Sequence, residues 1–133
     1  MAVIDEAQRE LLQKPVIMRV NTITPEGYPH SVPVWILLDG NDLILFSDRS
    51  ARKVKNVQAN PRGSVAYGGD PVGSPCLLIE GDFTLQDDPD HAITARITHH
   101  YEPQDAAEQW LDAWKGADHV ILRLKPRRVI RIS

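Results

Sequence analysis

Short segments in which hydrophobic residues alternate with polar ones, or follow each other in brief runs, make up most of the chain. Such segments, bounded by turn residues, are typical of β-strands. They predict strands at residues 16–23, 28–38, 42–47, 63–67, 76–85, 119–124 and 128–132. Pro25-Glu26-Gly27 and Asp39-Gly40-Asn41 have the composition of tight turns between antiparallel neighbours. The pattern therefore favours a small β-barrel.

Proline and glycine constrain how these strands pair. Pro29 and Pro33 lie inside the second predicted strand. Because proline has no N–H to donate to a neighbouring strand, we expect this strand at a sheet edge or at a bulge. Gly81 interrupts the fifth predicted strand and indicates a bulge there.

Hydrophobic residues recur at helical spacing in other segments. They predict helices at residues 4–13, 51–59, about 90–100 and 104–115, the second of them capped by Ser50. The order is helix, three strands, short helix, two strands, helices and two strands. We therefore expect one domain, residues 1–133, with a mainly β (α+β) fold: a six- to seven-stranded barrel with short flanking helices.

Composition narrows the class of protein. The chain has 133 residues, 42% of them hydrophobic and 25% charged, which is typical of a globular domain. No hydrophobic run approaches the roughly 20 residues that span a bilayer, so we expect no membrane partner. A single cysteine, Cys76, is compatible with a reducing compartment and predicts a cytoplasmic protein. The net charge of −3 argues against a general nucleic-acid binder.

The basic residues are not spread evenly. Between residues 49 and 62 five bases occur without an acid: Arg49, Arg52, Lys53, Lys55 and Arg62. They follow a predicted strand and accompany the start of a predicted helix, where free N–H groups and the helix dipole favour anions. Arginine binds phosphate oxygens in a bidentate manner, and lysine acts as a mobile point charge. The segment therefore predicts an anion site and favours phosphate as the anion.

Several segments together resemble a known family. The hairpin GYPHSVPVWI, the strand LILFS, the basic turn and helix RSARKVKNVQANPRGSV and the strand LLIEGDFTLQDDP resemble the flavin-binding split β-barrels related to pyridoxamine 5'-phosphate oxidase. Within that superfamily, the helix Arg-Lys-Val-Lys-Asn followed by Asn-Pro-Arg is similar to the coenzyme F-420-dependent oxidoreductases. The resemblance covers residues 16–89 well and the last strands loosely. It implies a homodimer with the cofactor at the subunit interface.

The resemblance also implies a set of cofactor-binding residues. By position, one group would contact the phosphate end or the acidic tail of the cofactor: Ser47, Arg49, Arg52, Lys53 and Lys55. Another would pack on the flat ring or bond to it through the backbone: Pro33, Val34 and Trp35. For Trp35, plain core packing stays open as an alternative.

The implied function is that of an oxidoreductase transferring a hydride between coenzyme F-420 and a small conjugated or heteroaromatic substrate. The cofactor carries the redox chemistry, so no catalytic triad is expected and no catalytic residue is assigned. An FMN-dependent oxidase or reductase of the same barrel is the alternative, since FMN carries a single terminal phosphate. Further bases at Arg123, Lys125, Arg127 and Arg128 suit the longer anionic tail of F-420 better, if they lie near the site. A non-enzymatic barrel that binds polyanions is the third hypothesis.

Other conspicuous residues have simpler explanations. His99 and His100 are adjacent, so on a helix they point in different directions, and we expect no metal site. Trp110, Leu111 and Trp114 form a hydrophobic stripe that is more typical of core or dimer contacts than of a substrate lid.

Overall fold

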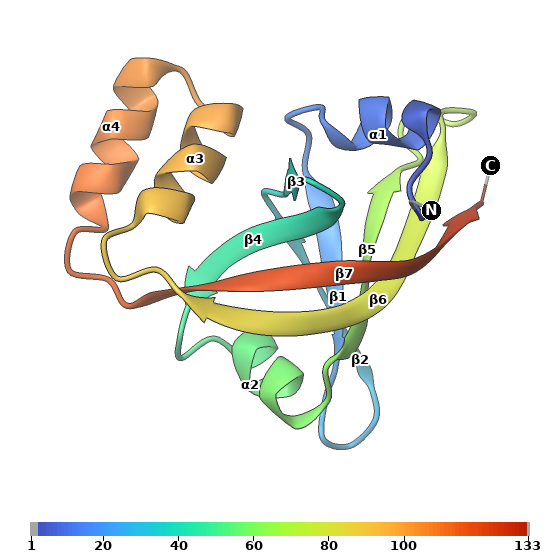
Figure 1. The fold of residues 1–133 in the computed structure, drawn as a ribbon, viewed down its shortest axis with the longest axis horizontal. Coiled ribbons are helices and arrows are strands. Elements are labelled where there is room, and N and C mark those ends of the chain that lie inside the picture. Colours follow the sequence, from blue (N-terminus) through green and yellow to red (C-terminus); the bar gives the residue numbers. More distant parts are fainter. Residues whose placement is uncertain (1–2, 133) are drawn as a thin grey trace.

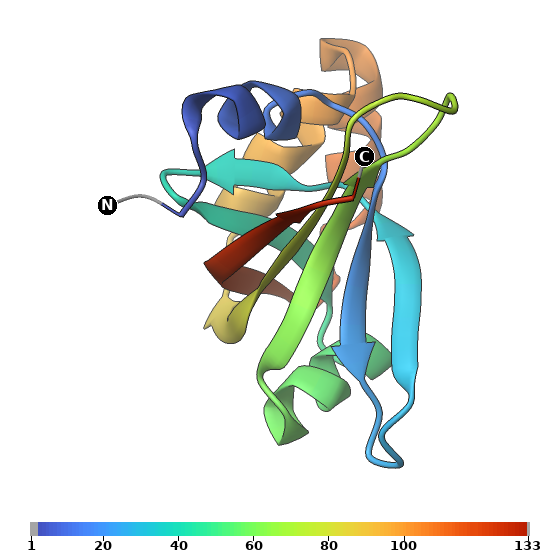
Figure 2. The ribbon, with the colours of Figure 1, turned by 90° about the vertical axis from the view of Figure 1, so that its right-hand side faces the viewer.

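A single curled sheet dominates the computed structural model, which describes residues 3–132 (Figures 1 and 2). Within these residues the strands are β1 (Met18–Ile23), β2 (Pro29–Val34), β3 (Leu37–Asp39), β4 (Asp42–Asp48), β5 (Arg62–Gly68), β6 (Cys76–Asp87) and β7 (His119–Arg131). The helices are α1 (Glu6–Leu12), α2 (Arg52–Ala59), α3 (Ala92–Tyr101) and α4 (Gln104–Ala113). Every strand pair is antiparallel, in the order β2-β1-β5-β6-β7-β4-β3. This confirms the predicted mainly β (α+β) barrel with short flanking helices.

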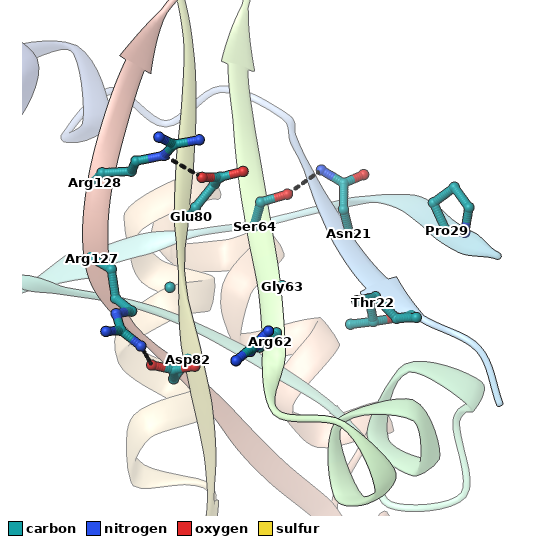
Figure 3. A pocket seen from close by; sticks show the side chains of 12 residues that line it. Asn21, Thr22, Pro29, Arg62, Gly63, Ser64, Glu80, Asp82, Arg127 and Arg128 are labelled. Atoms are coloured by element: carbon teal, nitrogen blue, oxygen red, sulfur yellow. Dashed lines mark hydrogen bonds and ion pairs between the residues drawn. The ribbon is translucent and has the colours of Figure 1, made fainter. Parts of the chain in front are cut away.

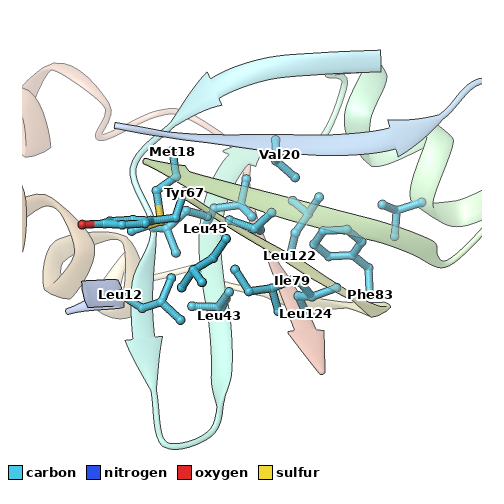
Figure 4. Close-up of a cluster of buried hydrophobic side chains, with 14 of the residues drawn as sticks. Leu12, Met18, Val20, Leu43, Leu45, Tyr67, Ile79, Phe83, Leu122 and Leu124 are labelled. Carbon is cyan, nitrogen blue, oxygen red and sulfur yellow. The ribbon is translucent and has the colours of Figure 1, made fainter. Parts of the chain in front are cut away.

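Alternation along the strands fills the interior of the barrel. Met18 and Val20 of β1 and Leu43 and Leu45 of β4 are fully or almost fully buried in one cluster. Figure 4 shows Tyr67 of β5, Phe83 of β6 and Leu122 of β7 meeting them at the centre. Because successive residues of a strand face opposite sides, the polar Arg19 lies outside between two core residues. Burial of these side chains is the main stabilising contribution to the barrel.

The sheet is open between its end strands, β2 and β3, where the chain crosses through Trp35 and Ile36. The single strand predicted over residues 28–38 is therefore wrong, because it breaks at this joint. The Tyr101 hydroxyl holds the joint: it accepts from the Ile36 N–H at 2.8 Å and lies 2.9 Å and 2.8 Å from the carbonyl oxygens of Ile36 and Val16. Pro29 and Pro33 lie on β2, which ends the sheet order, so the edge position predicted for them is confirmed.

The predicted bulge at Gly81 is confirmed by a register shift between Glu80 and Gly81. A Cβ atom on Gly81 would collide with the carbonyl of Lys125 on β7. Opposite the bulge, Pro126 pairs with Gly81 inside one continuous strand. The two final strands predicted from the sequence are therefore one, since the bulge accommodates the proline that was expected to separate them.

The helices close the barrel and extend it. In Figure 1, α2 lies at the lower end of the barrel, where Val54 and Val57 join the core. Its N-cap residue is Ala51, without a side-chain hydrogen bond, so Ser50 is not the cap that the sequence suggested. Helices α3 and α4 lie beside β4 (Figure 1), and Ile97 of α3 packs with Ile44 and Ile121 in a second cluster. Strand β4 is therefore buried on both faces, which explains its uninterrupted hydrophobic run.

Candidate functional site

Two adjoining recesses beside the opening of the barrel share Phe46 and Trp114 and form one groove. The first has a volume of about 390 Å³ and is lined by Ile17, Pro33, Val34, Trp35, Phe46, Trp110 and Trp114. The second has a volume of about 280 Å³ and is lined by Phe46, Ser47, Asp48, Ala51, Lys53, Trp114 and His119. We call the first recess the aromatic end and the second the polar end of the groove.

Stacked and tilted rings build the aromatic end. Trp35 stacks on Tyr101, with ring centroids 5.3 Å apart and planes 11° apart, and meets the ring of Phe46 at 6.3 Å. Trp114 packs on Phe46 at 5.2 Å and stacks with Trp110 at 5.3 Å. Trp110 remains 45% exposed. This end of the groove is suited to a flat, apolar group, because aromatic faces stack on such groups with little loss of conformational freedom.

The polar end holds a cation at the start of α2. Lys53 forms no ion pair with any residue from 3 to 132, and burial lowers the pKa of its ammonium, opposed by the charge of Asp48. Ala51, the N-cap of α2, lies in the same recess, so the free N–H groups of the first helical turn are close by. A half-buried, unpaired ammonium beside a helix N-terminus is well placed to receive a phosphate.

The other bases of the segment have different surroundings. Arg49 lies next to the groove, where its Nε and Nη2 atoms bind Asp118 at 2.8 Å and 3.2 Å and Nη2 binds Asp87 at 2.8 Å. These carboxylates raise the pKa of the guanidinium. Arg52 and Lys55 are exposed on α2 and do not line the groove. Of the residues that the resemblance implied, the structure thus brings Pro33, Val34, Trp35, Ser47 and Lys53 together.

A larger recess, of about 580 Å³, lies on another face of the sheet, over β1, β5, β6 and β7 (Figure 3). Arg128 binds Glu80 at 2.6 Å, and Arg127 is 3.4 Å from Asp82. Arg123 is bound elsewhere, by Asp39 and Asp42. None of these C-terminal bases lines the groove, so they do not extend its positive charge. The C-terminal bases therefore do not favour the longer cofactor tail, contrary to the expectation from the sequence.

Sequence reasoning did not find every lining residue. Phe46 and His119 were not singled out, and Trp110 and Trp114 were interpreted as core or dimer contacts. Phe46 contacts a segment that is distant in the chain, and such a contact leaves no local signal in the sequence. The spacing of the two tryptophans, in contrast, did indicate that they share one face of a helix. Among residues 3–132, no three histidine, cysteine or carboxylate side chains gather as a metal site would require. None of the helices in this range is long and apolar enough to cross a membrane.

A sheet open between β2 and β3, with a groove beside the opening, defines a split β-barrel. The family model described as pyridoxamine 5'-phosphate oxidase matches residues 4–132, and the chain belongs to that family.

Solved structures agree with this assignment. An F-420 reductase is 22% identical, with 96% of this chain and 98% of that chain covered and a TM-score of 0.77. A putative pyridoxamine 5'-phosphate oxidase from Listeria innocua is 25% identical, with 96% of each chain covered and a TM-score of 0.69. A conserved hypothetical protein from Mycobacterium tuberculosis is 20% identical over 98% of this chain and 85% of that one, with a TM-score of 0.77. A comparison with curated protein sequences gave no match.

Proposed function

We propose that the protein is an oxidoreductase that transfers a hydride between coenzyme F-420 and a small conjugated or heteroaromatic substrate. One observation carries the proposal: a single groove joins an aromatic end to an unpaired, half-buried lysine at a helix start. A flavin-type cofactor matches the two ends of the groove, because it has a flat apolar ring at one end and a charged phosphate at the other. The family and the F-420 reductase of similar structure support a cofactor of this type.

In this proposal, the edge strand β2 receives the ring. Pro33 and Val34 present backbone groups that no neighbouring strand covers on one side, because β2 ends the sheet order. Trp35 is fixed by its stacking on Tyr101 and offers a rigid wall. A bound flavin or deazaflavin supplies the hydride chemistry; these residues orient the ring and exclude water from it. A flat substrate would share the aromatic end of the groove with the ring and stack on it.

Lys53 and Ser47 would hold the phosphate inside the groove. Arg49, Arg52 and Lys55 lie outside it, where they would meet only a tail that leaves the groove. The two cofactors would therefore make different contacts with the basic residues. A longer F-420 tail would use the outer bases, whereas the terminal phosphate of FMN would stop at Lys53. Since Lys53 is the one cation that lines the groove in the described residues, an FMN-dependent oxidase or reductase is the second candidate.

The test is a visible absorption spectrum of the purified protein after incubation with each cofactor and desalting. Retention of F-420 but not FMN supports the first proposal, and the reverse supports the second. The variant Arg52→Gln with Lys55→Gln should weaken F-420 binding and leave FMN binding unchanged. If the protein retains neither cofactor but binds single-stranded nucleic acid with steep salt dependence, the enzyme proposal is wrong and the polyanion-binding barrel replaces it.

We further propose a homodimer with the cofactor at the subunit interface, as the family resemblance implies. The groove is open to one side, and a partner would complete the cover of the ring. Sedimentation with and without the retained cofactor tests this: a monomer in both states would contradict it. A cytoplasmic location stays a prediction that rests on the single free cysteine, Cys76.

A further inference from the structure

One buried histidine in the polar end of the groove has no role in the proposal so far. His119 is the first residue of β7 and is only 4% exposed, yet its ring lines the groove. The ring packs against Phe46 at 5.1 Å, against Trp114 at 5.6 Å and against His91 at 4.8 Å. Its position is therefore fixed from three sides.

The hydrogen bonds around His119 determine which nitrogen carries the proton. The Thr94 hydroxyl donates to Asp88 Oδ2 at 2.7 Å, and the same carboxylate accepts from the backbone N–H groups of Thr94 and Ile93 at 2.8 Å and 3.1 Å. A hydroxyl has one hydrogen, and that of Thr94 is directed to Asp88. The contact of 3.3 Å between Thr94 Oγ1 and His119 Nδ1 must therefore be donated by the ring. The neutral ring then carries its proton on Nδ1 and leaves Nε2 as an acceptor.

The surroundings keep the ring neutral. Burial lowers the pKa of His119, and the neighbouring His91 lowers it further, whereas Asp48, Asp88 and Asp118 act in the opposite direction. His91 donates its own Nε2 proton to the carbonyl oxygen of Ala117 at 2.9 Å. It therefore offers no hydrogen bond from that nitrogen to His119.

Nε2 of His119 has no hydrogen-bond partner among residues 3–132. Asp48 Oδ1 lies 3.6 Å from Nε2, which is beyond hydrogen-bond distance, and is itself an acceptor. Two acceptors therefore face each other in the polar end of the groove, beside the ammonium of Lys53. A ligand that fits here brings hydroxyl hydrogens as well as an anion.

We propose that Nε2 of His119 accepts a hydrogen bond from the hydroxylated chain that joins the ring to the phosphate in the bound cofactor. This inference rests on the proposed function. The lining of the polar end agrees with it, because His119 shares this recess with Phe46, which also lines the aromatic end, and with Lys53, the proposed phosphate ligand. Thr94 and Asp88 act as positioning residues, since they fix the ring nitrogen that donates and so the one that accepts.

The experiment compares two probes: FMN, and lumiflavin, which has the same ring with a methyl group in place of the chain. His119→Phe keeps an aromatic ring in the packing position and removes both nitrogens. It should weaken FMN binding about three- to tenfold, the scale of one hydrogen bond, and leave lumiflavin binding unchanged. His119→Gln, which retains an acceptor near the position of Nε2, should recover part of the loss. If the wild-type protein retains F-420 instead, the corresponding pair is F-420 and its N-methyl deazaflavin ring.

A spectroscopic measurement gives an independent readout. The ¹⁵N shifts of His119 should show a neutral ring protonated at Nδ1, with the Nε2 signal moving when FMN binds. Thr94→Val should weaken this preference, and Thr94→Ser should restore it. An Nε2-protonated ring in the wild-type protein would overturn the proposal, as would equal losses of FMN and lumiflavin or no loss at all in His119→Phe. Failure of the wild-type protein to bind any flavin or deazaflavin would instead overturn the proposed function, and this inference with it.

Discussion

The groove and the recess of Figure 3 show that neither the size of a cavity nor the number of its charges identifies the site. The recess over β1, β5, β6 and β7 is larger than either end of the groove and has three arginines, of which Arg127 and Arg128 are paired with carboxylates and Arg62 is exposed. The groove has one cation, and that cation is half-buried and unpaired. A phosphate can bind an unpaired ammonium without first displacing a carboxylate, and water weakens its bond to a half-buried cation less than its bond to an exposed one. The burial of an unpaired charge therefore distinguishes the two regions.

Removal of the unpaired charge should have the largest effect on binding. Lys53→Gln should weaken cofactor binding by about 1.5–3 kcal/mol, the scale of a hydrogen bond to a charged group. Arg62→Gln removes the same charge from the other recess and is the matched control, because Arg62 lines only that region. Fluorescence titration with the retained cofactor measures both. Equal losses in the two variants would show that the general positive charge, and not the groove, holds the anion.

A substitution in the other recess should affect stability instead. Gly81→Ala places a methyl group against the backbone carbonyl of Lys125 at the bulge, so the free energy of unfolding should fall by about 1–3 kcal/mol. Gly116→Ala, with no atom within 4 Å of the added Cβ, is the control. Urea denaturation measures the loss, and the cofactor affinity of the folded fraction should not change. A selective loss of affinity in Gly81→Ala would assign this recess a part in cofactor binding.

The aromatic end should contribute less than Lys53. Trp114→Ala removes the ring that joins the two recesses and should weaken binding of the bare flavin ring by about 1 kcal/mol, the scale of one aromatic pair. Trp114→Phe should retain most of the affinity. Titration with lumiflavin, which lacks the phosphate, isolates this end of the groove. If Trp114→Ala binds lumiflavin as tightly as the wild-type protein does, the ring lies elsewhere.

The two ends of the groove also differ in how far the sequence predicts them. The basic segment was evident because Arg49, Arg52, Lys53 and Lys55 are close in the chain. The sequence did not show that one of these cations is paired, two are exposed and one is half-buried. The pairing depends on Asp87 and Asp118, which come from β6 and from the segment before β7. Local charge patterns locate such a cluster; only the fold shows which of its charges are free.

The same distinction applies to the fold. The strands and the bulge at Gly81 follow from alternation and from a single glycine, which are local signals. The continuity of β7 through Pro126 does not follow from a local signal, because it requires the bulge on the partner strand, β6. The aromatic end joins β2, β4 and α4, and no periodicity within one segment indicates that Phe46 and Trp114 meet. Contacts between distant segments are the part that the sequence did not predict.

The protonation of His119 should make stability depend on pH in a defined window. Since burial lowers its pKa below the usual 6.5, the unfolded chain binds the proton first as the pH falls. The stability that the neutral ring contributes is therefore complete above 6.5 and is lost as the pH falls from there to the lower native pKa. His119→Phe should flatten this part of the profile, and His99→Gln, at an exposed position of α3, should not. Urea denaturation between pH 8 and pH 5 measures it, and an unchanged slope in His119→Phe would show that other groups control stability there.

The smallest effect on binding is expected from the cation that the structure finds paired. Arg49→Gln removes a charge next to the groove but also frees Asp87 and Asp118, which Arg49 binds at 2.8 Å. Exposed ion pairs contribute little, so cofactor affinity should change by no more than about threefold. The change should disappear at high salt, and Asp118→Asn in the same protein should restore the wild-type affinity by removing the freed carboxylate. If Arg49→Gln instead loses as much cofactor affinity as Lys53→Gln, the guanidinium turns from its carboxylates to the phosphate when the cofactor binds. Ion pairs in the free protein would then not distinguish the groove from the recess of Figure 3.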